Sequence, residues 1–227
     1  MSYVLPPAPV TSLPVHGSDA RFPVRRIFCV GRNYEEHARE MGADTREPPF
    51  FFTKPADALV TDGAAAPWPL ATQDLHHEAE LVVALGSGGV NVAPEDAPDL
   101  VWGYAAGNDL TRRDLQAAAK AARRPWDMAK AFDASAPCGT LVPVSVCGHP
   151  ASGRITCTVD GKITQDADIA DMIWDVPHII AHLSGLVRLA PGDLIFTGTP
   201  AGVGPVQRGQ TVSVTIEGLG TVETRIA

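Results

Sequence analysis

Three carboxylate side chains border strand-like segments of this chain. In the stretch QDLHHEAELVVALG, Glu78 and Glu80 are two residues apart, and Asp109 follows in GYAAGNDLTRRDLQ. Side chains two apart in a strand point to the same face, so we expect the two glutamates to lie side by side. Glutamates at a strand start usually face water. Here the chain continues into LVVALG, which is apolar on both faces and predicts a covered strand, so the pair calls for a compensating cation.

These oxygen ligands suit a hard divalent ion. Taken alone, Asp109 is typical of a turn or a helix entry. Together with Glu78 and Glu80 it would complete a site for Mg²⁺ or Mn²⁺ with open positions for water and substrate. His76 and His77 raise zinc as an alternative. We favour Mg²⁺ or Mn²⁺, because His77 faces away from the glutamates in a strand and no cysteine lies nearby in the sequence.

The composition argues against several classes of partner. The chain has 227 residues, a formal net charge of -8 and a pI near 5.3, so nucleic acid and anionic membrane surfaces would repel it. No segment approaches the ~20 apolar residues of a membrane span, and the start lacks the basic region of a signal peptide. The four cysteines are far apart without a C-x-x-C pair, which favours reduced thiols and a cytoplasmic setting.

The elements that must position the carboxylates are mostly short strands. Glycine and proline number 21 and 20, which predicts many turns, and we expect a β-rich α+β fold in one domain with an N-terminal arm. Helices are expected at NYEEHAREMG with Asn33 as N-cap, at LTRRDLQAAAKAARR with Thr111 as cap, and at DVPHIIAHLSGLVR. Strands are expected at RRIFCVG, ELVVALG, RITCTVDGK, DLIFTGTP and QTVSVTIEGLGTVETRIA, the last a hairpin that turns at Gly218 to Gly220.

Six ordered sequence blocks resemble the fumarylacetoacetate hydrolase superfamily. They are FCVGRNYEEHAREMG, PPFFFTKPADALV, DLHHEAELVVALG, GYAAGNDLTRRDLQ, PWDMAKAFDASAPCG and GDLIFTGTPAGVGPV. The resemblance implies a catalytic domain over residues 25–227 after an arm of residues 1–24. It also implies a mixed β-sandwich roll, usually as a homodimer, and a metal held by Glu78, Glu80 and Asp109.

Two further constellations gain a role from this resemblance. His37 and Glu40 are three residues apart and share a face of the expected helix, as ordinary solvated charges also would. The resemblance implies a dyad in which Glu40 orients the imidazole and His37 takes a proton from water. Lys54 and Lys130 lie in apolar segments, where a lysine often extends its ammonium to solvent. The resemblance implies instead that Lys130 stabilises an oxyanion or enolate and that Lys54 supports the site.

Two polar residues are candidates for the substrate pocket. Gln116 lies seven residues after Asp109, about two helical turns, so it would face the same cavity unless it is an exposed helix residue. The stretch TGTPAGVGP lacks the G-K-[ST] ending of a phosphate loop. The resemblance implies that Thr199, within this stretch, binds the substrate carboxylate. The absence of a G-x-S-x-G motif argues against a serine hydrolase.

The resemblance implies chemistry on a small 2-oxo acid. Within the superfamily it favours cleavage of the C3–C4 bond of fumarylpyruvate to fumarate and pyruvate, as in gentisate breakdown. Arg32, Arg113 and Arg112 are candidates to receive the distal carboxylate of this substrate. The alternatives are an acylpyruvase, an oxaloacetate decarboxylase, an isomerase of homoprotocatechuate breakdown, and a non-catalytic metal-binding protein on the same scaffold.

Overall fold

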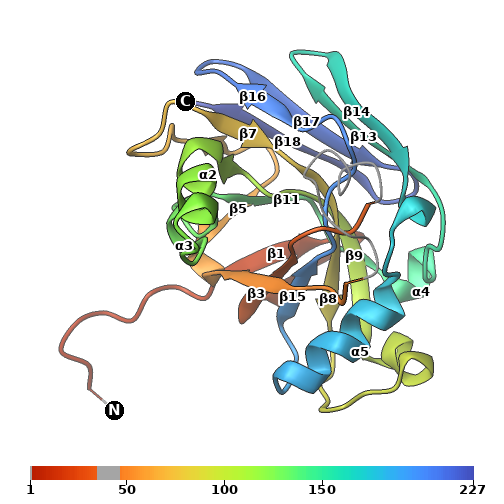
Figure 1. Cartoon of the computed structure of the whole chain (residues 1–227). Helices are drawn as coiled ribbons and strands as arrows, with labels where there is room; N and C mark the ends of the chain where they lie inside the picture. Colours follow the sequence, from red (N-terminus) through yellow and green to blue (C-terminus); the bar gives the residue numbers. More distant parts are fainter. Residues whose placement is uncertain (1, 35–46) are drawn as a thin grey trace.

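A large mixed β-sheet forms the centre of the protein. The computed structural model describes residues 2–34 and 47–227. Within these residues, Figure 1 shows the strands curling around a common core. The largest sheet has eight strands, of which seven follow one spatial order and β12 (Val142–Pro143) pairs with β9. The order is β4 (Phe51–Lys54), β3 (Arg26–Val30), β15 (Asp193–Phe196), β8 (Ala79–Leu85), β9 (Val101–Asn108), β11 (Ala136–Cys138) and β5 (Leu59–Thr61).

Three smaller sheets complete the β-structure of the described chain. The five-stranded sheet runs β14 (Lys162–Asp168), β13 (Arg154–Val159), β17 (Thr211–Ile216), β18 (Gly220–Ile226) and β6 (Ala65–Ala66). The three-stranded sheet runs β10 (Thr111–Arg112), β7 (Leu75–His77) and β16 (Gly204–Val206). The hairpin of β1 (Ser12–Val15) and β2 (Ser18–Pro23) forms the last sheet.

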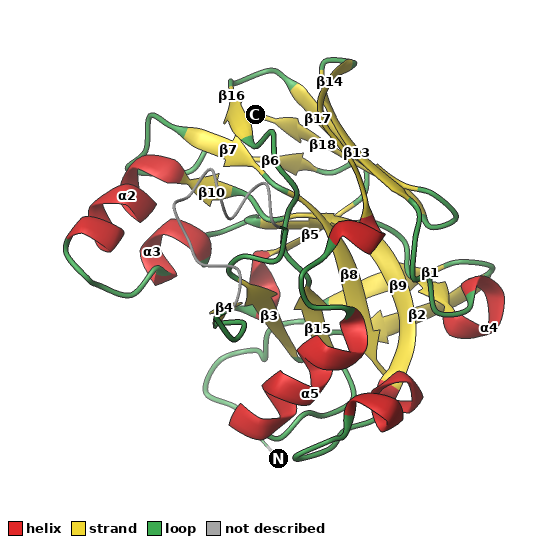
Figure 2. Cartoon of the chain, turned by 45° about the vertical axis from the view of Figure 1, so that its right-hand side comes forward, coloured by secondary structure: helices red, strands yellow, loops and turns green. Residues whose placement is uncertain are grey.

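The helices lie at the edges of the sheets, and Figure 2 shows α2 and α3 on one side with α5 below them. The α-helices are α2 (Arg113–Ala121), α3 (Asp127–Lys130), α4 (Val144–Cys147) and α5 (Val176–Leu186). Three short 3-10 helices are η1 (Ala56–Ala58), η2 (Pro94–Leu100) and η3 (Ile169–Asp171). No helix in the described ranges is long and apolar enough to cross a membrane.

The central strand β8 is covered on both faces, as its apolar sequence predicts. Leu81 and Val83 belong to the core that also contains residues of β13 and β17. Val82 and Ala84 point to the opposite core, which contains residues of β1, β3 and β15. Because side chains alternate along a strand, β8 contributes residues to both cores. The arrangement confirms the predicted β-rich α+β class and the mixed β-sandwich roll.

Most predicted elements are present, and one boundary was wrong. The five predicted strand segments correspond to β3, β8, β13, β15 and the β17–β18 hairpin, and α5 begins after Asp175, whose carboxylate accepts the His178 backbone N–H at 3.0 Å. Thr111 does not cap α2, because Thr111 and Arg112 pair with β7 and the helix begins at Arg113. The predicted helix at NYEEHAREMG lies outside the described residues from position 35 onward.

The predicted N-terminal arm contains a packed hairpin. Leu13 and Phe22 of the β1–β2 hairpin are buried in the core beside β3 and β15. Residues 2–11 precede this hairpin and extend away from the body in Figure 1. The four cysteines are free, in keeping with the predicted reduced thiols.

Candidate metal centre and active site

The three predicted carboxylates meet where β7, β8 and β9 come together. Glu80 lies in β8 opposite Gly107 of β9, and the Asp109 backbone N–H donates to the Glu78 carbonyl oxygen at 2.8 Å. All three carboxylates are buried, and one oxygen atom from each lies within 4.8 Å of the others. The pairing of β8 with β9 therefore assembles residues that are about thirty positions apart in the chain.

Glu80 is the triad acid that forms no ion pair with a basic side chain of the described residues. Burial, followed by the charges of Asp109 and Glu78, raises the pKa of Glu80 well above its ordinary value. Within the described chain, its carboxylate accepts a hydrogen bond from the Gly198 backbone N–H at 2.8 Å. Gly198 has a φ of +96°, and a Cβ there would lie 2.7 Å from the Asn33 Cβ, so a glycine is needed at this position. Three buried carboxylates with an excess of negative charge at Glu80 fit a divalent cation.

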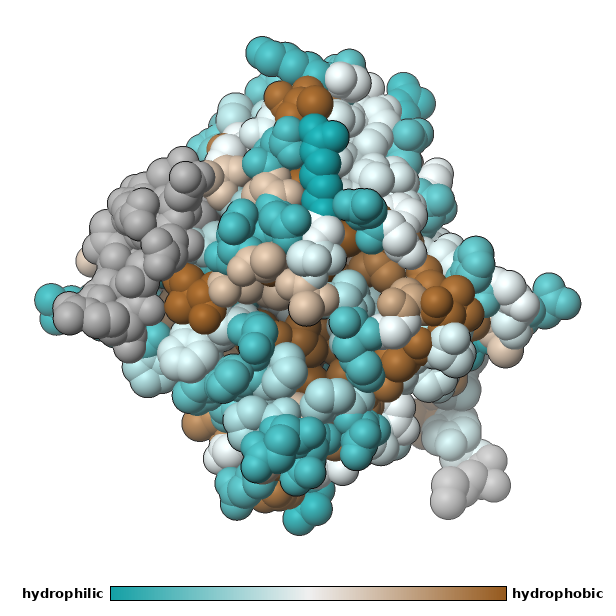
Figure 3. All heavy atoms as spheres, turned by 90° about the vertical axis from the view of Figure 1, so that its right-hand side faces the viewer, coloured by the Kyte–Doolittle hydropathy of each residue, from teal (hydrophilic) through white to brown (hydrophobic). Residues whose placement is uncertain are grey.

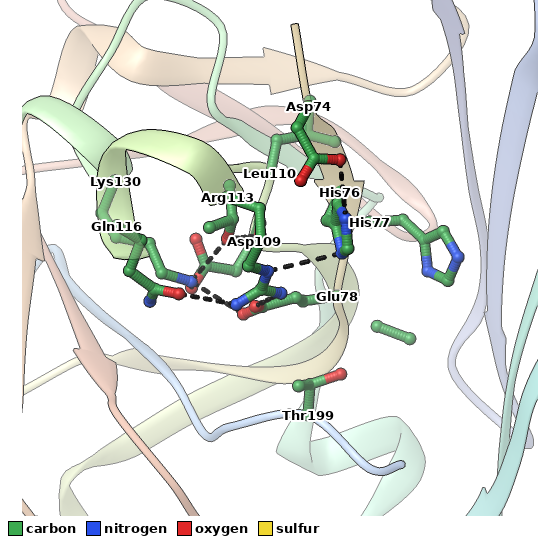
Figure 4. A network of polar contacts seen from close by, with 12 residues as sticks. Asp74, His76, His77, Glu78, Asp109, Leu110, Arg113, Gln116, Lys130 and Thr199 are labelled. Carbon is green, nitrogen blue, oxygen red and sulfur yellow. Dashed lines mark hydrogen bonds and ion pairs between the residues drawn. The ribbon is translucent and has the colours of Figure 1, made fainter. Parts of the chain in front are cut away.

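Three basic side chains contact Glu78 and Asp109, and Figure 4 shows two of them, Lys130 and Arg113. Lys130 Nζ contacts Glu78 Oε2 at 2.7 Å and Asp109 Oδ2 at 2.6 Å. Lys54 Nζ contacts Asp109 Oδ1 at 2.8 Å, and Arg113 Nη2 contacts Glu78 Oε1 at 2.5 Å. Burial opposes the charge of Lys130, but the two carboxylates outweigh it and raise its pKa above the ordinary value. Each cation is thus held in place by the acids that it neutralises.

Lys130 has no ammonium hydrogen left for another partner. Besides the two carboxylates, its Nζ donates to Thr111 Oγ1 at 2.6 Å, and an ammonium group has three donors. Thr111 in turn donates its hydroxyl to the Asp109 carbonyl oxygen at 3.0 Å. In this arrangement Lys130 acts as a fixed positive charge.

Neither neighbouring histidine belongs to the carboxylate cluster of the described residues. His77 points away from the triad in Figure 4, and its Nδ1 lies 3.1 Å from Gln165 Oε1 and 3.4 Å from Cys157 Sγ. His76 Nε2 lies 2.9 Å from Asp74 Oδ1. The ligand set is therefore all oxygen, which suits Mg²⁺ or Mn²⁺ better than zinc.

Gln116 and Thr199 both lie beside the triad. Gln116 is buried, and its Oε1 accepts from Arg113 Nη1 at 2.7 Å, so the face of α2 that carries these two residues points to Glu78. Thr199 is also buried and directly follows Gly198, whose backbone N–H binds Glu80.

One side chain that joins the two halves of the site was not predicted from the sequence. Gln165 of β14 accepts from the Ala79 backbone N–H at 3.0 Å, between the two glutamates. Its Nε2 donates to Thr199 Oγ1 and to the Pro200 carbonyl oxygen, both at 2.8 Å. A glutamine in a polar strand segment carries no recognisable signal, and only the packing of β14 against the site shows this role.

The structure does not bring the remaining predicted site residues into contact with the triad among the described residues. His37 and Glu40 lie outside the described residues. Arg112 donates to the carbonyl oxygens of Leu70 and Met128, so its guanidinium is bound to backbone rather than directed to the triad. The Arg32 guanidinium carbon lies 5.4 Å from the centre of the Phe50 ring.

A cavity of about 580 Å³ lies elsewhere, between the 169–178 segment and residues 149–151. Figure 3 looks onto the side of α4 and α5, where apolar side chains gather in hollows of the surface. Trp174, Met172 and His149 are among the lining residues, and no member of the triad is. This cavity is therefore not the candidate active site.

The rolled sheet carries a buried acidic triad that could hold a metal ion. Residues 26–227 match the family model described as fumarylacetoacetate (FAA) hydrolase C-terminal. The chain therefore belongs to the fumarylacetoacetate hydrolase family. This establishes the family, and relatives of this chain are named for different reactions.

Relatives with different activities are similar to this chain. A mitochondrial oxaloacetate decarboxylase of Dictyostelium discoideum is 41% identical over 87% of this chain and 91% of its own. A solved fumarylpyruvate hydrolase from Pseudomonas aeruginosa, in complex with Mn²⁺ and pyruvate, is 50% identical over 100% of this chain and 99% of its own, with a TM-score of 0.97. A solved structure of a putative fumarylpyruvate hydrolase from Burkholderia cenocepacia is 54% identical over 100% of this chain and 95% of its own, with a TM-score of 0.94.

Proposed function

We propose that this protein is a metal-dependent hydrolase that cleaves the C3–C4 bond of fumarylpyruvate to fumarate and pyruvate, in a gentisate-type pathway. The observation that carries the proposal is the full-length similarity to the Pseudomonas aeruginosa fumarylpyruvate hydrolase, whose structure holds Mn²⁺ and pyruvate. Pyruvate is one of the two expected products. The buried triad supports the same reading, because it would supply the ligands for such an ion.

Glu78, Glu80 and Asp109 would hold Mg²⁺ or Mn²⁺. When bound, the ion would polarise the 2-oxo group and stabilise the enolate charge. Three basic residues already balance the three acids, so a divalent ion would leave a positive excess. A dianionic substrate offsets that excess.

The chain's own residues would position the substrate and move the proton. Thr199 and adjoining backbone N–H groups would bind the substrate carboxylate, while the fixed charge of Lys130 would stabilise the oxyanion that forms at C4. His37, oriented by Glu40, would remove a proton from the attacking water. The C3–C4 bond then breaks, the acid is released as fumarate, and His37 returns the proton to C3 of the pyruvate enolate.

An oxaloacetate decarboxylase is the second candidate, since a curated relative carries that activity. It would use the same triad and the same pyruvate enolate, and the group that leaves C3 would be carbon dioxide. The higher identity to the fumarylpyruvate hydrolases favours the first reaction.

The test follows the enol absorbance of fumarylpyruvate, acetylpyruvate and oxaloacetate on one preparation, with Mg²⁺, with Mn²⁺ and with a chelator. We expect rapid metal-dependent loss of fumarylpyruvate, with fumarate and pyruvate as products. Preference for oxaloacetate would replace the proposal by the second candidate. In the same assay His37→Ala should lower kcat by roughly 10²–10⁴-fold while metal affinity is kept.

We further propose a homodimer that works in the cytoplasm. Four free cysteines, three of them buried, are compatible with a reducing compartment. Light scattering of the purified protein tests the dimer, and fractionation of the source cells tests the compartment. A monomeric mass or recovery in another fraction would refute the respective statement.

A further inference from the structure

Two cations near the site have no acidic partner in the described part of the chain. Lys54, Lys130 and Arg113 each form an ion pair with Glu78 or Asp109. Arg32 and Lys120 are both partly buried, yet neither forms a hydrogen bond or ion pair with a described residue, and Arg32 Nε is buried without a partner among those residues. Burial removes part of the hydration of a cation, so an anionic ligand that contacts these two side chains would recover part of that cost.

The position of Lys120 on α2 directs it toward the site. Arg113, Gln116 and Lys120 are separated by three and four residues, so they share one face of the helix. Arg113 and Gln116 on this face bind each other, and Arg113 reaches Glu78. Lys120 therefore extends the polar face of α2 outward from the triad.

A pair of aromatic rings connects Lys120 to Arg32. Lys120 Nζ lies 5.0 Å from the centre of the Trp126 ring, and Trp126 meets Phe50 edge to face at 5.3 Å. Arg32 lies over the other ring of this pair. Each cation is thus held against a ring face, which fixes its direction without neutralising its charge.

The electrostatic environment agrees with this geometry. Burial, followed by the charges of Arg113 and Arg32, lowers the pKa of Lys120 to about 8. Lys130 lowers it further, and Glu78 is the opposing negative charge. Lys120 therefore lies in a positive field that an anionic ligand would relieve.

We propose that Lys120 and Arg32 form the subsite for the distal carboxylate of a dianionic 2-oxo acid substrate. This inference rests on the proposed function, and it identifies the group that distinguishes fumarylpyruvate from acylpyruvates without a second carboxylate. Arg113 is assigned another role, because its guanidinium is already bound by Glu78 and Gln116 and so positions the triad.

The binding test uses two ligands that differ only in the distal carboxylate, 2-oxoadipate and 2-oxohexanoate. Dissociation constants are measured by calorimetry on the Mg²⁺-loaded full chain for the wild type, Lys120→Met and Lys120→Arg. We expect the wild type to bind 2-oxoadipate more tightly, and Lys120→Met to lower this preference by roughly tenfold or more, as loss of a charge-assisted bond implies. Lys120→Arg should keep most of the preference.

Lys162→Met is the matched control, because Lys162 is exposed at the start of β14. It should leave the preference unchanged, and thermal melts establish that each variant is folded. A wild-type protein without preference for 2-oxoadipate, or a Lys120→Met variant with the wild-type preference, would overturn the subsite.

Turnover separates this inference from the proposed function. Lys120→Met should raise KM for fumarylpyruvate at least tenfold more than KM for acetylpyruvate, with a smaller effect on kcat. Equal losses on both substrates would refute the subsite while the hydrolase assignment stands. A wild type that prefers 2-oxoadipate but does not cleave fumarylpyruvate would refute the hydrolase assignment while the subsite stands.

Discussion

Replacing Glu80 by glutamine should make the metal-free protein more stable and remove its response to metal. Among the described residues, Glu80 forms no ion pair, whereas Glu78 and Asp109 each bind two cations. The substitution keeps the shape and an acceptor for the Gly198 N–H, and it removes one buried charge. The wild-type carboxylate is therefore expected to lower stability in exchange for metal binding.

The magnitude follows from the separation of the ligand atoms. The triad oxygens lie within 4.8 Å of one another, and two unit charges at that distance repel by about 3–4 kcal/mol at an effective dielectric constant of ~20. Glu80 has two such neighbours, while Lys130 and the Gly198 N–H offset much of the repulsion. We expect a net gain of about 1–3 kcal/mol, which is roughly 2–10 °C in Tm for a chain of this size.

The assay is thermal unfolding in a chelator and then in Mg²⁺ or Mn²⁺. The wild type should gain about 2.7 kcal/mol when the metal is at 100 times its Kd, and Glu80→Gln should gain far less. Glu95→Gln is the control, since Glu95 is exposed in η2 and should change neither value. A Glu80→Gln variant that melts below the wild type in chelator, or that keeps the full metal response, would refute this reasoning.

Four further changes probe the rest of the site. Lys130→Met leaves two buried carboxylates without their shared cation, so denaturant unfolding should show a loss of about 3–5 kcal/mol. Gln165→Leu removes the donor to Thr199, so KM for fumarylpyruvate should rise roughly tenfold while the Mn²⁺ affinity measured by calorimetry changes little. Asn33→Ala removes three buried hydrogen bonds to Trp174 and Thr197, and should lower the unfolding free energy by about 2–4 kcal/mol without altering metal affinity. Loss of the Lys120 ammonium above pH about 8 should lower kcat/KM for fumarylpyruvate, and in Lys120→Met a pH profile should lack this decline.

Local patterns in the sequence determined the strands and the proximity of Glu78 to Glu80, whereas Asp109 joins them only through the pairing of β8 with β9. The apolar run after Glu80 requires a covered strand, because exposing its apolar side chains to water on either face would cost free energy. Glu78 lies between β7 and β8, two residues before Glu80, and the two carboxylates meet as predicted. The pattern at Asp175 sets the start of α5. These features depend on neighbours a few residues apart.

Pairing between distant segments decided where α2 begins and where neighbouring arginines point, which the sequence predicted wrongly or left open. Thr111 carries a good capping side chain, yet the pairing of β10 with β7 delays the helix to Arg113. Arg112 and Arg113 are adjacent and chemically alike, and the packing directs one to backbone carbonyls and the other to Glu78.

The direction of a long side chain depends on which partners lie within its reach. Gln165 gained its position in the same way, from Ala79 and Thr199, which are far away in the chain. The sequence by itself thus determined which groups are available for chemistry, because burial and alternation are local. The tertiary structure decided which of them meet, because hydrogen bonds and ion pairs require contact between segments that the chain brings together only on folding.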